Sequence, residues 1–108
     1  TEPRTVDATI NLHKRLHKVG FKKRARKAVK AVREFAADLM RTSDVRVDPT
    51  LNRYIWNKGV RNVPRRVRVR MIRKVKEGEE EDGEKLYTVV THVGVPSFKG
   101  LKTEEAKA

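Results

Sequence analysis

The 108-residue chain is the size of one domain, and its 27 lysines and arginines against 14 acidic residues give a formal net charge of +13 at pH 7. Such an excess is larger than solubility requires and indicates an anionic partner. No run approaches the roughly 18 apolar residues of a membrane-spanning helix, and the absence of cysteine excludes disulfides and thiolate metal sites. We therefore expect a single soluble domain that is neither secreted nor inserted in a membrane.

The charge is distributed unevenly along the chain. Residues 1–74 contain 22 of the basic residues and only six acids, whereas the remainder is net negative. A long polyanion suits this density, because each neutralised phosphate releases condensed counterions and adds affinity that does not depend on sequence. The composition thus favours nucleic acid as the partner.

The first half of the chain predicts one strand and one long helix. Residues 1–8 include a proline and show no apolar period, so we interpret them as a flexible arm that orders only against a partner. Residues 9–16 alternate apolar and polar side chains, as a strand with one buried face does. Apolar residues recur at helical spacing over residues 22–41, which predicts the long helix, with basic residues on its opposite face.

The middle of the chain predicts a second, shorter helix. Residues 45–47 form a short extended piece, after which Asp48 and Pro49 make a capping residue followed by a proline that suits the first helical turn. The helix should run to about Lys58, because Gly59 is a favourable residue at a helix end.

The last part of the chain predicts a β-hairpin. Valine and methionine alternate with arginine over residues 66–71, and residues 86–93 read as a returning antiparallel strand. Between them, residues 76–85 are acidic and suit a solvated loop. The whole pattern predicts an α+β domain over residues 9–102: a small three-stranded sheet packed with one long and one short helix, with extended termini and a charged tail over residues 103–108.

The sequence predicts neither a catalytic site nor a cofactor site. It contains no glycine-rich phosphate loop, no nucleophile elbow and no metal-binding histidine pair on a predicted helix. The segment around His13 and His17 alternates like a strand, which would hold their side chains too far apart for a shared metal ion. We interpret His92 as structural or as a phosphate donor. The acidic cluster over residues 77–84 lacks the ligand spacing of a calcium loop. We therefore expect a protein without enzymatic activity, cofactor, metal or small-molecule substrate.

The basic residues are the candidate functional residues. Arg66, Arg68 and Arg70 recur at about 6.6–6.8 Å along the strand, which is comparable to phosphate spacing in nucleic acid, so we expect them to clamp phosphates. Trp56 falls off the apolar stripe of the short helix, and both stacking on a base and packing remain open for it. The complete set of candidate RNA-binding residues is Lys14, Arg15, Lys22, Lys23, Arg24, Arg26, Lys27, Lys30, Arg33, Arg46, Trp56, Lys58, Arg61, Arg65, Arg66, Arg68, Arg70 and Arg73.

Several separated motifs resemble one ribosomal family. They are TINLHKRLH at residues 9–17, FKKRA at 21–25, DVR at 44–46, LN at 51–52, IW at 55–56, KGV at 58–60, RVRVR at 66–70 and KGL at 99–101. In this order they resemble large-subunit ribosomal protein thirty-one of archaea and eukaryotes, over about residues 9–102.

The resemblance implies a compact α+β domain that binds and bridges large-subunit rRNA near the nascent-peptide exit in cytoplasmic translation. It implies neighbouring ribosomal proteins as partners and no catalysis. It also implies an outer surface where exit-site chaperones or targeting factors dock, for which the acidic loop and the tail are candidates. The ribosome places the protein in the cytoplasm, with nuclear or nucleolar assembly if the source is eukaryotic.

Apart from the resemblance, a free-standing nucleic-acid-binding protein of the chromatin or RNA-chaperone type remains the alternative. Such a protein should show a dimer interface or a helix that reads a groove, and neither is evident. The basic part of the long helix lacks the asparagine and glutamine that read adenine edges, so we expect binding through shape and phosphate rather than bases. A small nuclease ranks third, because the carboxylates are segregated from the basic face.

Overall fold

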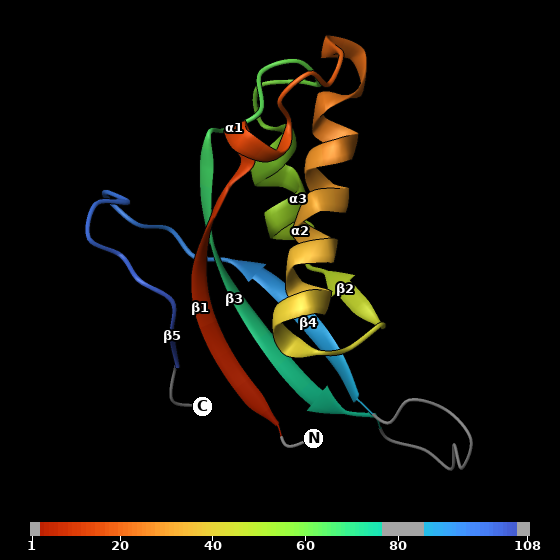
Figure 1. Cartoon of the computed structure of the whole chain (residues 1–108), viewed down its shortest axis with the longest axis vertical. Coiled ribbons are helices and arrows are strands. Elements are labelled where there is room, and N and C mark those ends of the chain that lie inside the picture. The colour runs from red at the N-terminus through yellow and green to blue at the C-terminus, as the bar shows by residue number, and fades with distance from the viewer. Residues whose placement is uncertain (1–2, 77–85, 106–108) are drawn as a thin grey trace.

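Two long antiparallel strands form the centre of the sheet in the computed structural model, which describes residues 3–76 and 86–105 (Figure 1). Strand β1 (Arg4–Asn11) pairs along its whole length with β3 (Arg66–Val75). Strand β4 (Leu86–His92) runs antiparallel to β3 on its other side, which confirms the predicted hairpin strands.

Two short strands extend the sheet at its edges. Strand β2 (Val45–Val47) pairs in parallel with β4, and β5 (Glu104–Glu105) pairs antiparallel with β1. The sheet is therefore mixed and five-stranded, in the order β2-β4-β3-β1-β5. The α+β class is confirmed, but the predicted three-stranded sheet is wrong. The extended piece predicted at residues 45–47 is β2, but its place in the sheet and the whole of β5 depend on pairing with residues distant in sequence, which a local pattern does not reveal.

The helices cover one face of the sheet (Figure 1). Helix α2 (Arg24–Met40) follows a 3₁₀ turn over Phe21–Lys23, and α3 (Pro49–Trp56) lies beside it. The side chain of Asp48 accepts a hydrogen bond from the Thr50 amide at 3.0 Å, so the predicted cap of α3 is present. Both predicted helices are thus confirmed, with ends that differ by a few residues.

The core lies between this sheet face and the helices. Alternate residues of the central strands, including Val6, Ala8 and Ile10 of β1, are fully buried there. The buried side chains of α2 and α3 that meet them combine two alanines with larger apolar residues, which together fill the space between helix and sheet. From the helices these are Ala28, Val32, Ala36, Met40, Leu51 and Ile55.

The N-terminal prediction requires correction. Strand β1 begins at Arg4 rather than at residue 9, so residues 4–8 belong to the sheet and do not form an arm. The strand also ends at Asn11, and a short helix α1 (Leu12–Arg15) follows. The side chain of Asn11 caps this helix by accepting from the Lys14 amide at 3.1 Å.

The C-terminal prediction also changes. Residues 104–105 of the predicted tail form β5, whereas the acidic loop predicted at residues 76–85 lies outside the described residues except for Lys76. The Nζ atom of Lys76 is 3.2 Å from Asp44 Oδ2. In the described part of the chain, no helix is long and apolar enough to cross a membrane.

Candidate nucleic-acid interface

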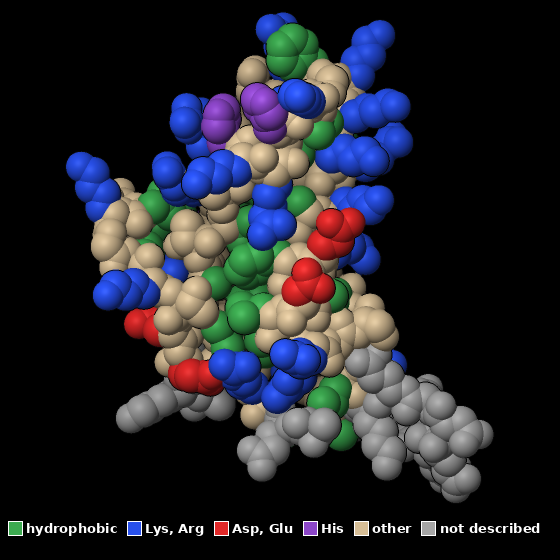
Figure 2. Space-filling model, in the orientation of Figure 1, with side chains coloured by type: hydrophobic (Ala, Val, Ile, Leu, Met, Phe, Trp, Pro, Cys, Tyr) green, Lys and Arg blue, Asp and Glu red, His purple; other side chains and the backbone are tan. Residues whose placement is uncertain are grey.

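The outer face of α2 carries the densest group of exposed basic side chains. Arg26, Lys27 and Lys30 lie on it, while Ala25, Ala28 and Val32 face the core. Residues 8–33 contain no acid, so this half of the helix is uniformly positive. Figure 2 shows the basic side chains gathered over the upper part of the molecule and along the edge of this helix, with acidic side chains lower down. The arrangement can bind phosphates at several points along one surface.

A groove between α2 and α3 adjoins this face. It encloses about 310 Å³ and is lined by Arg26, Val29, Lys30, Arg33, Asn52 and Trp56. The structure thus brings Trp56, which is 40% exposed, together with three of the predicted basic residues. An aromatic ring flanked by cations can stack on a base while the cations hold its phosphates.

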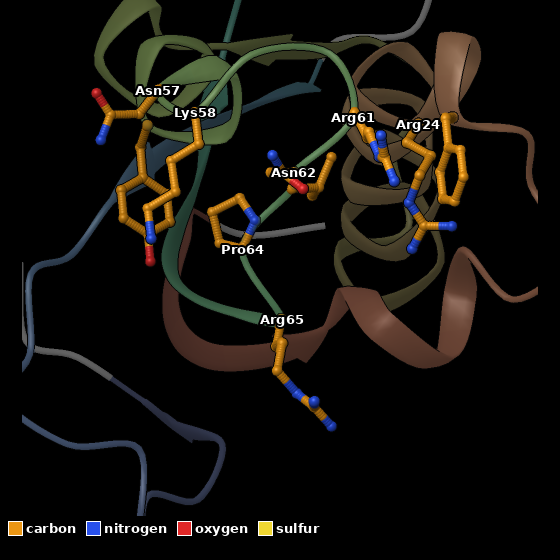
Figure 3. A pocket seen from close by; sticks show the side chains of 10 residues that line it. Arg24, Asn57, Lys58, Arg61, Asn62, Pro64 and Arg65 are labelled. Atoms are coloured by element: carbon orange, nitrogen blue, oxygen red, sulfur yellow. The ribbon is translucent and has the colours of Figure 1, made fainter.

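The loop between α3 and β3 forms a second basic feature at the N-terminal end of α2. The Ala25 amide, which has no partner inside its helix, donates to the Val60 carbonyl at 3.0 Å and holds the loop there. Between the loop, α3 and the 3₁₀ turn lies a cavity of about 890 Å³. Its lining includes Arg24, Lys58, Arg61 and Arg65, four of the predicted RNA-binding residues (Figure 3).

The three arginines of β3 that are predicted to clamp phosphates have different surroundings. Arg66 is exposed, but Arg68 is only 3% exposed and donates to Thr9 Oγ1 at 3.0 Å and to the Lys102 carbonyl at 2.9 Å. Arg70 forms a two-point ion pair with Asp7, whose carboxylate raises the pKa of this guanidinium. In the folded chain the C-terminal segment covers Arg68, so phosphate binding by this residue stays a prediction and would have to displace these hydrogen bonds.

Other predicted arginines also hold the fold together. Arg24 donates to the carbonyls of Leu16 and Val19, which close the turn after α1, at 3.2 and 3.1 Å. Arg73 donates to the Met40 carbonyl at 2.8 Å and so caps the end of α2. These two side chains are half-buried, and their structural bonds compete with any contact to phosphate.

Arg46 belongs to a small charged cluster at the sheet edge. Its guanidinium pairs with Asp44 at 3.2 Å and lies over the Tyr87 ring at 4.2 Å from the ring centroid. Hydrogen bonds from Arg46 and Lys76 hold the pKa of Asp44 below its ordinary value. This acid reduces the positive potential around Arg46, which makes it a weaker candidate than the residues of α2.

The remaining predicted residues are exposed and available. Arg15 and Arg61 lie over the rings of Phe35 and Phe21, at 5.3 and 4.2 Å from the centroids, and Arg33 has a long contact of 3.4 Å to the Val45 carbonyl. In the described ranges, no side-chain hydrogen bond or ion pair is found for a further group of exposed basic residues. These are Lys14, Lys22, Lys23, Arg26, Lys27, Lys30, Lys58, Arg65 and Arg66.

Uncharged residues at the interface were missed by the sequence analysis. Phe21, Asn57 and Asn62 line the larger cavity, and Asn52 lines the groove. They come from the 3₁₀ turn, from α3 and from the loop after it, and only the packing of these segments around α2 brings them to the two sites. The face of Tyr54 stacks on His92, with ring centroids 4.1 Å apart, and burial raises the pKa of this tyrosine.

Over residues 3–76 and 86–105 there is no group of three histidine, cysteine or acidic residues that could hold a metal ion. His13 lies in α1 and His17 just after it, so the strand argument made for them does not hold. The site consists of exposed cations, half-exposed aromatic rings and amides, and these can bind an anionic polymer by charge and stacking.

The fold and these surfaces define a small, strongly basic α+β protein with exposed cations on several surfaces. A model of the family Ribosomal protein L31e matches residues 2–84. A large ribosomal subunit protein eL31 of Cyanophora paradoxa is 60% identical over 104 residues, which cover 96% of this chain and 87% of that protein. Proteins of the same name from Spodoptera frugiperda and Heliothis virescens are each 57% identical over 96% of this chain and 83% of theirs.

The chain therefore belongs to the ribosomal protein L31e family, the family that its motifs resemble. Membership identifies it as a ribosomal protein and not as an enzyme, in agreement with the prediction from sequence.

Proposed function

We propose that the chain is a structural component of the large ribosomal subunit that binds and bridges large-subunit rRNA. The exposed cations of α2 support this proposal most directly. They occupy one continuous face without an acidic residue, and within the described residues no ion pair neutralises Arg26, Lys27 or Lys30. Cations left unpaired in a folded protein remain available for phosphates.

The mechanism is architectural. RNA segments that approach each other repel through their phosphates, and a rigid protein with cations on separate surfaces lowers that repulsion. The α2 face and the loop of residues 57–65 belong to one packed unit, since the Ala25 amide bonds to the Val60 carbonyl. One RNA segment bound on α2 and another at the loop would therefore be held in a constant relative position.

The proposal extends to location and partners. The relatives are named as large-subunit proteins, and the resemblance implies a place near the nascent-peptide exit, with neighbouring ribosomal proteins and exit-site chaperones or targeting factors around it. In this proposal the protein acts in the cytoplasm and, in a eukaryote, joins the subunit in the nucleolus.

Sedimentation of a tagged copy from cell extract tests the proposal. The extract is separated on a sucrose gradient after washing at moderate and high salt. The tagged chain should migrate with the large subunit at both salt concentrations, because many phosphate contacts in a folded assembly resist exchange. Recovery at the top of the gradient would contradict the proposal and favour a free-standing nucleic-acid-binding protein.

Two matched variants sharpen this experiment. The triple change Arg26→Ala, Lys27→Ala and Lys30→Ala removes the α2 face and should reduce the fraction that migrates with the subunit. The control Lys74→Ala, Lys99→Ala and Lys102→Ala removes the same charge from exposed positions elsewhere and should migrate as the unchanged chain does. Equal loss in both variants would mean that only net charge matters.

A further inference from the structure

Two sides of the cavity at the N-terminal end of α2 are formed by side chains that are already held in place. Arg24 is fixed by its bonds to two carbonyls, and the Arg61 guanidinium lies over the Phe21 ring at 4.2 Å from its centroid. On the α3 side Tyr54 is stacked on His92, and its hydroxyl donates to the Arg66 carbonyl at 3.4 Å. Side chains that are ordered before a ligand binds lower the entropic cost of binding.

The side chains that line the cavity are of the kinds that bind nucleotides. Four cations line the cavity and no acid does, so its potential attracts an anion. The volume of about 890 Å³ lies within the roughly 300–1,000 Å³ of pockets that hold small organic groups. Flat groups, among them Phe21, Tyr54 and Pro64, are interspersed with the cations. Cations for phosphate and flat surfaces for a base therefore occur together.

The arrangement of polar groups agrees with this. Figure 3 shows Arg24 and Arg61 on one side of the cavity and Lys58 on the other, with Asn62 and Pro64 between them and Arg65 directed outward. An amide offers a donor and an acceptor at once, which suits the edge of a base, whereas a phosphate needs only donors. Asn62 is the lining residue placed to meet such an edge.

We propose that this cavity receives one unpaired RNA nucleotide, whose base stacks against the Phe21–Arg61 layer and meets Asn62 while its phosphates contact Lys58 and Arg65. The inference rests on the proposed rRNA binding and adds to it a site for a single extruded base. A paired base cannot enter, because its faces and edge are already occupied within the duplex. The site thus distinguishes a bulged or looped nucleotide from a regular helix, which the charged face of α2 does not.

Two hairpin RNAs test the proposal on the full chain. One carries a single bulged adenosine and the other has the same stem without the bulge. The chain should bind the bulged hairpin more tightly, on the order of tenfold, as expected for one stacked base. With 2-aminopurine at the bulge, its fluorescence should change on binding as the base moves into the cavity.

The variant Phe21→Ala/Asn62→Ala removes the ring and the amide without altering charge. Both residues are exposed, Phe21 by 58%, so the fold should persist, which far-UV circular dichroism checks. The variant should lose the preference for the bulge and the 2-aminopurine response, while its affinity for the plain hairpin stays within about twofold. Val60→Ala, an apolar deletion in the same loop that does not line the cavity, is the matched control and should keep both.

The outcomes separate the two proposals. Equal affinity of the unchanged chain for both hairpins, or a preference that survives in the double variant, would overturn the nucleotide site and leave rRNA binding standing. Failure to bind either hairpin would overturn both.

Discussion

Arg66 and Arg68 lie two residues apart on the same face of β3 and have opposite surroundings. Arg66 is exposed, whereas Arg68 is 3% exposed and bonds to β1 through Thr9 and to the C-terminal segment through the Lys102 carbonyl. A buried guanidinium is expensive to desolvate and is tolerated only when its donors are satisfied. Arg68 is therefore a structural residue that fastens the C-terminal segment to the sheet.

This difference predicts separate effects for two similar substitutions. Arg68→Ala should lower the free energy of unfolding by about 2 kcal/mol, because it removes the charge-assisted hydrogen bonds that join β3 to β1 and to the C-terminal segment. Arg66→Ala should change it by less than about 0.5 kcal/mol. Urea denaturation followed by circular dichroism measures both. Equal stability of the two variants would show that Arg68 does not fasten the segment.

The lowered pKa of Asp44 predicts that the folded chain loses part of its stability at low pH. Its pKa is lowered in the folded state by hydrogen bonds from Arg46 and Lys76, so the stability it contributes is fully present above its unfolded pKa of about 3.9. That contribution is lost as the pH falls through the lower folded value. Unfolding in urea at pH 7 and at pH 3 should show a smaller loss for Asp44→Asn than for the unchanged chain. The exposed Glu34→Gln control should retain the full loss, and identical behaviour of both variants would contradict the assignment.

At single residues, the sequence predicted which basic side chains would be exposed on α2 but not which arginines of β3 would be covered. Helical spacing alone assigns Arg26, Lys27 and Lys30 to the face opposite the core. Strand alternation assigned Arg68 to the face opposite Val67 and Val69 correctly. It carried no information about the residues 34 positions later that cover it.

At the scale of elements, strong local signals were sufficient for the helices. The cap at Asp48, the proline after it and Gly59, which has a φ of +90°, predicted the limits of α3 closely. The extended piece predicted at residues 45–47 is the edge strand β2, but the other edge strand had no such signal. Strand β5 is two residues long and exists through its pairing with Val6 and Asp7, nearly a hundred positions earlier.

Strand β1 was placed too late, although its alternation extends further back. Val6, Ala8 and Ile10 all face the core, but Asp7 and Ala8 have low strand propensity and obscured the pattern. The helical turn that follows was marked by Asn11, a favourable N-cap, and by the four-residue spacing of Leu12 and Leu16.

The position of β1 predicts the effect of N-terminal truncation. A chain that begins at Arg4 should unfold at nearly the same temperature as the full chain, because all eight residues of β1 remain. A chain that begins at residue 9 loses Val6 and Ala8 from the core and five pairs to β3, and should be unfolded at 25 °C. Thermal unfolding by circular dichroism compares them. A stable fold without residues 1–8 would restore their interpretation as an arm.

For the whole molecule, charge is separated in a way that single elements do not reveal. Residues 8–33 and 49–66 contain no acid, and the fold brings them together, because α2 packs on α3 and the loop after α3 bonds to the start of α2. The described acids lie on other parts of the chain, such as the end of α2 and strand β5. Composition predicted a polyanion as partner, but only the fold joins the two acid-free stretches into one surface.

The salt dependence of RNA binding tests whether this surface, rather than net charge, binds the phosphates. For a duplex RNA probe, the logarithm of affinity should fall linearly with the logarithm of salt concentration, with a slope proportional to the number of phosphates bound. Replacing Arg26, Lys27 and Lys30 by alanine should reduce that slope by roughly 0.9 for each phosphate that is no longer neutralised, a reduction of about 2–3.

The control that removes Lys74, Lys99 and Lys102 changes net charge equally and should leave the slope within about one unit, because those side chains lie away from the acid-free helix face. Alanine is the best helix former, so the α2 variant should remain folded and weak binding cannot be ascribed to unfolding. If both variants reduce the slope alike, RNA binding is spread over the molecule, and the α2 face has no special role.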